Sequence, residues 1–194
     1  MAAPALRFAT YDDLLRLPRE ARAEVIGGVV YEGASPAPRH GRAMVALGRY
    51  VGGPFDQDDD PGGWWILAEV DVRFSPSDIL RPDLAGWRRE RMPLLPASRP
   101  IDIVPDWVCE IRSPSTASHD VLRKRPLYAA HGVPWLWAVD PEARIIVCFE
   151  NRGGTWAQVA GGGDGEKARL PPFEATEIDV SRVFGPASDP EGAG

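Results

Sequence analysis

The sequence predicts an α+β protein in which a mixed central β-sheet is flanked by helices. Short apolar runs rich in β-branched residues alternate with segments of helical period, which is the pattern of a sheet covered by helices. A strand–helix–strand succession over about 104–139 predicts a parallel pair of strands joined by a right-handed crossover. Glycine pairs at 27–28 and 153–154 predict N-terminal and C-terminal β-hairpins, and hence antiparallel neighbours.

The bulk properties favour one cytoplasmic domain. The chain has 194 residues, of which 44% are hydrophobic and 26% charged, and its net charge is −6. We expect a single restriction endonuclease-like domain over 1–184 and a disordered tail over 185–194. Cys109 and Cys148 lie in apolar runs and read as buried thiols of a reducing compartment. No apolar run approaches the ~20 residues of a membrane span, and we see no signal peptide at the start.

The N-terminal part predicts two helices separated by a hairpin. Residues 10–22 read as a short helix, with Thr10 as its N-cap and acidic residues in the first turn. Residues 23–33 form the first hairpin. After a loop, a second helix is expected over about 41–51. Its apolar stripe consists of Met44, Val45, Leu47 and Val51.

The remaining segments predict the other strands and the crossover helix. The expected strands occupy 64–77, 79–87, 102–112 and 134–141, and the second hairpin occupies 144–159. An irregular, basic segment over 88–100 connects the second strand to the third. A loop and then a helix, together spanning 113–133, connect the third strand to the fourth.

Two carboxylates are notable because their surroundings predict burial. Asp83 follows a proline in RPDLAGW, and Glu110 lies within the apolar strand VCEIR. Glu110 comes 27 residues after Asp83, which is compatible with two adjacent strands and a loop. If both side chains point from one end of the sheet, they form an oxygen-rich site for Mg²⁺ or Mn²⁺.

A lysine on the crossover helix is the third candidate. Asp120, Lys124 and Tyr128 are spaced at i, i+4 and i+8, so they share one helix face. Lys124 could then reach the two carboxylates and offset negative charge on a phosphate undergoing attack. Pro126 predicts a kink near residues 122–126, because it removes a helical hydrogen bond.

Each candidate also has a purely structural interpretation. Asp83 is compatible with a turn acid after proline, and Asp120 with Lys124 is compatible with a surface ion pair of little energetic consequence. Glu110 needs a partner or a proton if it is buried in an apolar strand. A structural salt bridge would satisfy it as well as a metal would.

The combined motifs resemble the Uma-type family of putative restriction endonucleases, which is similar in fold to the PD-(D/E)XK nucleases. The resemblance rests on RPDLAGW followed by PDWVCEIRSPSTASHDVLRKRPLYAAHGVPWLWAVDP. It extends from AEVIGGVVYEG through HGRAMVALGRY to the terminal IDVSRVF. It implies a restriction endonuclease-like fold and a metal-dependent site for phosphodiester hydrolysis.

The resemblance also assigns roles to residues. It implies that Asp83 and Glu110 are metal ligands. The superfamily's usual lysine would lie two residues after Glu110, where this chain has Arg112, and arginine cannot act as a base at neutral pH. Lys124 then takes the place of that lysine. Glu24 matches a supporting acidic residue of the first hairpin, and His40 matches a family position whose role is left open.

The sequence therefore predicts a Mg²⁺- or Mn²⁺-dependent endonuclease-like hydrolase acting on nucleic acid, DNA above all. Arg112 or Arg123 would contact phosphate. On resemblance we expect a homodimer, and no membrane partner. Two alternatives stay open, namely a weakly active or inactive module of this fold that binds DNA or protein, and a structural homodimer whose carboxylates form an ion network. The acidic net charge and Arg112 favour the binding module.

Overall fold

The computed structural model describes residues 7–18, 20–33, 35–113 and 123–186. The strands are β1 (Arg22–Ile26), β2 (Val29–Gly33), β3 (Trp64–Ala68), β4 (Val72–Ser75), β5 (Asp78–Leu80), β6 (Leu84–Arg88), β7 (Trp107–Ile111), β8 (Trp135–Asp140), β9 (Ile145–Asn151), β10 (Trp156–Gly163), β11 (Lys167–Ala168) and β12 (Ile178–Asp179). The helices are α1 (Tyr11–Leu14), α2 (Pro38–Gly52), α4 (Arg125–Ala130) and α5 (Val180–Phe184), and a π-helical turn, η1 (Gly53–Gln57), follows α2.

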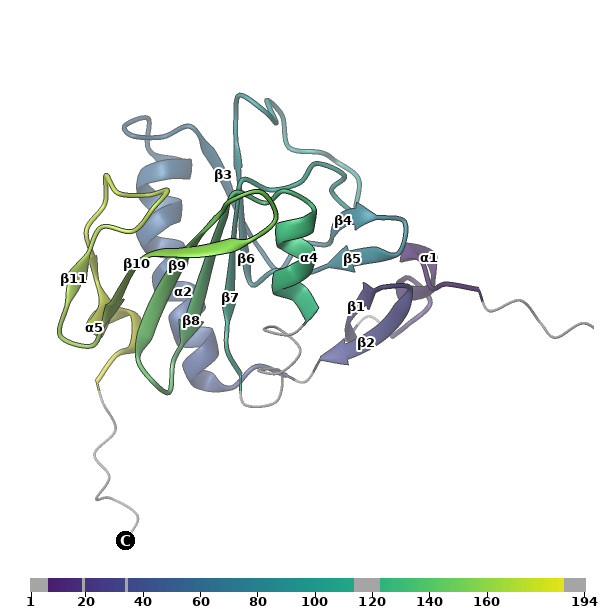
Figure 1. The fold of residues 1–194 in the computed structure, drawn as a ribbon, viewed down its shortest axis with the longest axis horizontal. Helices are drawn as coiled ribbons and strands as arrows, with labels where there is room; N and C mark the ends of the chain where they lie inside the picture. Colours follow the sequence, from purple (N-terminus) through teal and green to yellow (C-terminus); the bar gives the residue numbers. More distant parts are fainter. Residues whose placement is uncertain (1–6, 19, 34, 114–122, 187–194) are drawn as a thin grey trace, which may run out of the picture.

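A six-stranded sheet forms the centre of the fold (Figure 1). Its strand order is β10-β9-β8-β7-β6-β3, and β7 and β8 form its parallel pair. The other neighbours in this sheet are antiparallel. The predicted mixed sheet is therefore confirmed. The β9–β10 hairpin turns at Gly153 and Gly154, which both adopt positive φ as the sequence predicted for that turn.

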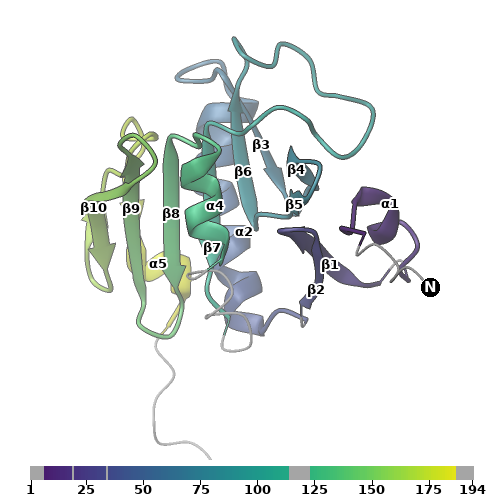
Figure 2. The same ribbon diagram turned by 45° about the vertical axis from the view of Figure 1, so that its right-hand side comes forward.

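Helices α2 and α4 cover opposite faces of this sheet (Figure 2). Alternation along β7 separates the two cores: Trp107, Cys109 and Ile111 pack on the α2 side, whereas Val108 packs with Tyr128 of α4. Glu110 has the same parity as Val108 and so belongs to the α4 face. Period-two alternation thus places the carboxylate within reach of the helix that follows β7.

A smaller, four-stranded sheet in the order β2-β1-β5-β4 lies beside the central one (Figure 1). Its β1–β2 hairpin turns at Gly27 and Gly28, with φ of 58° and 75°, as a two-residue turn of this twist requires. One face packs against α1 through Tyr11, and the other joins the core on the α4 side. The two sheets therefore share one hydrophobic core.

The segments 64–77 and 79–87 differ from the sequence prediction, because each contains two strands. The first breaks at Glu69, whose φ of +51° ends β3, and the chain continues as β4. The second breaks at 81–83, between β5 and β6. The Glu69 N–H donates to the Asp83 carbonyl at 3.2 Å, so the breaks lie opposite each other. Here the paired strands leave the central sheet and enter the smaller one.

Three helices also differ in extent from the prediction. Helix α1 covers only Tyr11–Leu14 of the predicted 10–22, and Arg22 already belongs to β1. Helix α2 begins three residues before the predicted start, with Pro38 in its first turn, where the missing N–H of proline costs no hydrogen bond. Helix α4 begins at Arg125 with Pro126 in its first turn, and residues 123 and 124 directly before it are π-helical. The kink predicted near residues 122–126 lies partly outside the described residues. In the part of the chain that the structure describes, no helix has the length and apolar character needed to cross a bilayer.

Candidate active site

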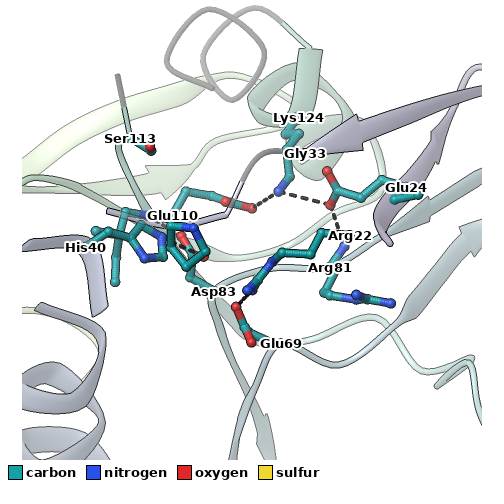
Figure 3. A pocket seen from close by; sticks show the side chains of 13 residues that line it. Arg22, Glu24, Gly33, His40, Glu69, Arg81, Asp83, Glu110, Ser113 and Lys124 are labelled. Atoms are coloured by element: carbon teal, nitrogen blue, oxygen red, sulfur yellow. Dashed lines mark hydrogen bonds and ion pairs between the residues drawn. The ribbon is translucent and has the colours of Figure 1, made fainter. Parts of the chain in front are cut away.

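A cavity of about 90 Å³ lies where the two sheets separate (Figure 3). Both strand breaks line it, the first through Glu69 and the second through Arg81 and Asp83. The remaining lining comes from β1, the end of β2, the start of α2 and the loop before it, the end of β7 and the loop after it, and the residue before α4. Asp83, Glu110 and Lys124, the three main candidates from the sequence, all line this one cavity.

The Asp83 carboxylate is oriented by donors from two other elements. Its Oδ2 accepts the backbone N–H of Ile111 at 2.6 Å, because β6 and β7 are neighbours whose ends meet here. Its Oδ1 lies 3.0 Å from Nε2 of His40 in the first turn of α2. His40 is only 5% exposed, and its other ring nitrogen, Nδ1, has no hydrogen-bond partner among the described residues. These contacts hold the Asp83 carboxylate in one orientation. An acidic residue that served only to form a turn would not need them.

Glu110 is paired as well as buried. Its side chain is 7% exposed, and its Oε1 accepts hydrogen bonds from Lys124 Nζ at 2.8 Å and from the Tyr128 hydroxyl at 2.5 Å. The predicted i, i+4 relation thus brings Lys124 and Tyr128 to the same carboxylate oxygen. A carboxylate in an apolar strand needs hydrogen-bond partners, and charge-assisted hydrogen bonds of this kind supply them.

Lys124 connects the two sheets. Its ammonium lies 2.8 Å from Glu110 in the central sheet and 3.0 Å from Oε1 of Glu24 in the smaller sheet. The same Glu24 oxygen accepts the backbone N–H of Arg81 at 2.5 Å. The Lys124 side chain is 5% exposed, so its charge is removed from bulk water and compensated by two carboxylates.

Arg112 and Arg123, the two cations expected to contact phosphate, do not line the cavity. Arg112 was expected beside Glu110, but its guanidinium pairs with Asp140 at 2.5 Å and its side chain is 56% exposed. Strand β7 ends at Ile111, so strand alternation does not extend to Arg112. Arg123 lies over the Tyr31 ring and donates to its hydroxyl. Asp120 lies outside the described residues.

The cavity also contains residues that the sequence interpretation missed. Glu69 and Arg22 form an ion pair at its edge, and Arg81 and Ser113 contribute to its lining. A positive φ at a glutamate has no sequence signature, so the break at Glu69 could not be seen within an apolar strand pattern. Arg22 precedes the predicted first hairpin and Arg81 lies within the predicted strand 79–87. A basic residue at either kind of position is too common to single out.

The donor set fits a small, hard divalent cation. Mg²⁺ is bound in proteins by one or two carboxylates, with water and phosphate oxygens completing its shell. Asp83 and Glu110 supply two carboxylates in one cavity, and His40 and the Ile111 N–H already orient the first. No group of three or more His, Cys, Asp or Glu side chains suited to a metal occurs within the described ranges. The residues therefore fit a cation that keeps much of its hydration.

The fold places the protein in the nuclease-fold class. A solved structure, that of a "putative nuclease" of the DUF820 family from Anabaena variabilis, superposes on the chain with a TM-score of 0.70. The similarity covers 90% of this chain and 97% of that one at 19% sequence identity. At this identity the similarity establishes the shared fold. It confirms the predicted restriction endonuclease-like architecture.

The family follows from the sequence. The profile of the Uma2 family, described as "Putative restriction endonuclease", matches residues 8–181. The chain belongs to the Uma2 family. The resemblance predicted from the motifs is thereby confirmed. A comparison with curated proteins gave no match.

Proposed function

We propose that the protein is a metal-dependent phosphodiester hydrolase that cleaves DNA. Membership of a family described as restriction endonucleases supports a nuclease role. The observation that carries the proposal is the position of Lys124, whose Nζ lies 2.8 Å from Glu110 in the cavity that Asp83 also lines. In this proposal the buried Lys124 acts as the lysine that is usual in the superfamily, because Arg112 at the usual position cannot do so.

In this proposal Asp83 and Glu110 would hold the cation, Mg²⁺ or Mn²⁺. A bound divalent ion supplies Lewis-acid stabilisation of the charge that develops on phosphoryl oxygens. His40 and the Ile111 N–H keep Asp83 in one orientation, and Tyr128 does the same for Glu110. These contacts reduce the reorganisation needed when substrate binds.

Lys124 would act on the attacking side of the reaction. Its ammonium is held by Glu24 and Glu110, so it presents positive charge at a fixed and buried point of the cavity. Fixed charge in such a site stabilises a transition state more strongly than the same charge in water. A lysine also exchanges protons far more readily than an arginine, so it is suited to positioning and activating a water.

The test is nicking of supercoiled DNA with Mg²⁺, with Mn²⁺ and with EDTA. We expect wild-type cleavage that EDTA abolishes, and a loss of about 10²-fold or more in Asp83→Asn and in Lys124→Met. The cleavage rate of Lys124→Arg should also stay low, because arginine restores the positive charge but not the compact ammonium group. The sequence has a second lysine, Lys167, paired with Glu177 on the surface, so Lys167→Met is a matched control that should cleave at the wild-type rate.

Stability has to be measured beside activity. Removing Lys124 leaves Glu24 and Glu110 without its charge, and breaking a buried pair costs about 3–5 kcal/mol. Asp83→Asn keeps the shape of the side chain and separates lost chemistry from lost folding. Equal nicking by wild type and both site variants would contradict the proposal. DNA binding without cleavage by wild type would instead favour a binding module.

A further inference from the structure

A second cavity, of about 390 Å³, adjoins the candidate active site. This volume falls in the range of small-ligand sites. One wall is formed by α1 and the residues after it, and contributes the aliphatic side chains of Leu14, Leu15 and Leu17. The opposite wall contributes Asp71, Arg81 and Arg99. The cavity lining is therefore mainly polar, with two arginines and one carboxylate beside a smaller aliphatic part.

The two cavities share a dividing wall. Arg81 lines both, with its backbone N–H on Glu24 of the first cavity and its side chain directed to Asp71 of the second. Glu69 lines the first cavity and Asp71, two residues later, lines the second.

The charge in the second cavity is net positive. Asp71 is compensated, because its Oδ1 accepts from Arg81 at 2.7 and 2.8 Å and its Oδ2 from the Tyr11 hydroxyl at 3.0 Å. Arg99 is exposed, and its guanidinium makes no ion pair or hydrogen bond with any residue in the described ranges. An uncompensated arginine at the mouth of a cavity is a suitable group for binding a phosphate.

We propose that this second cavity binds the nucleotide next to the scissile phosphate of a DNA strand, with Arg99 contacting its phosphate. The inference rests on the proposed function, because it takes the first cavity as the position of the reacting phosphodiester. The sugar and base would lie on the leucine wall of α1. Arg81, engaged with Asp71, forms the divider that keeps the two phosphates apart.

The test compares two substrates in the presence of Mn²⁺. Bis(4-nitrophenyl) phosphate offers a phosphodiester without a neighbouring nucleotide, whereas a short DNA oligonucleotide offers both. For Arg99→Gln we expect KM for the oligonucleotide to rise about tenfold, with a smaller change in kcat. The loss of kcat/KM on the small diester should be several-fold smaller. Arg99→Lys should recover part of the oligonucleotide affinity.

The control is Arg49→Gln, which removes an exposed arginine from the last turn of α2, and Arg49 lines neither cavity. It should match wild type on both substrates. The inference would be overturned if Arg99→Gln behaved like this control, or if its kcat/KM fell equally on both substrates. Either result would leave the proposed function intact. Oligonucleotide affinity measured by fluorescence anisotropy separates the two ideas further. Wild type that binds but does not cleave would refute the hydrolase alone, whereas no binding would overturn the second cavity's role.

Discussion

Individual residues show why lysine, and not arginine, stands beside Glu110. The sequence has 22 basic residues, and Lys124 and Lys167 are its lysines. A compact ammonium fits between the two carboxylate oxygens at 2.8 and 3.0 Å, whereas a planar guanidinium would have to enter edge-on. Choice of lysine at this buried position in an arginine-rich chain is thus consistent with a need for its chemistry.

The two cysteines provide a prediction at the same scale. Burial raises the pKa of Cys109 well above its ordinary value, and the nearby charges of Asp83 and Glu110 raise it further. Burial also raises the pKa of Cys148. Since the thiolate is the reactive species, neither thiol should react with Ellman's reagent in the folded protein, even at pH 9.

The measurement is thiol titration with and without denaturant. Both thiols should react promptly in guanidinium chloride. Fast labelling of the native protein would mean that the sheet opens readily at β7 and β9. Comparison of Cys109→Ser with wild type would identify which thiol had become accessible.

At the scale of elements, two glycines predict opposite effects of the same substitution. A Cβ added at Gly86 in β6 would meet side-chain atoms of Ile66, Trp64 and Trp107 at 3.1–3.2 Å. A Cβ at Gly48, in the interior of α2, would meet nothing within 4 Å. The position of Gly86 is crowded. The position of Gly48 has open space, and the glycine there only lowers the helix propensity.

We therefore expect Gly86→Ala to destabilise the protein by about 1–3 kcal/mol, because overpacking forces neighbouring side chains to move. Gly48→Ala should stabilise it by about 0.5–1 kcal/mol, because alanine loses less backbone entropy in a helix. Urea unfolding of both variants against wild type tests the pair. Equal effects in the two variants would show that packing around β6 is looser than these distances indicate.

Sequence patterns predicted the elements well where local chemistry decides them. The glycine pair at 27–28 predicts its hairpin, because two positive φ values at that turn favour glycine. The breaks at Glu69 and 81–83 escaped prediction, since they arise from the transfer of paired strands between two sheets. Arg112 was expected at the position of the family's lysine, two residues after Glu110, but β7 ends at Ile111 and the Arg112 side chain is not held on the Glu110 side by strand alternation.

For the molecule as a whole, the charge distribution determines how many DNA phosphates it could contact under the proposed function. The net charge is −6, so a broad basic surface does not dominate. The cations that line the two cavities and are accessible to phosphate are Arg22, Arg81 and Arg99. DNA binding should therefore depend on a few local contacts.

Salt dependence measures that number directly. With three phosphate contacts, the slope of log K against log salt concentration should lie between about −2 for single-stranded DNA and about −3 for duplex DNA. Anisotropy titrations over a range of KCl concentrations give the slope. A slope twice as steep would require a wider basic surface, and Arg99→Gln should make it shallower by about one.

The position of Lys124 between Glu24 and Glu110 has a consequence for how this chain could be recombined with its relatives. The two carboxylates belong to different sheets, and α4 follows the lysine that joins them. A shift of β1 would move Glu24 and change its distance from Lys124. The contact between Lys124 and Glu110 would then change as well. Chimaeras between family members should therefore stay active only when the small sheet and the start of α4 come from the same parent.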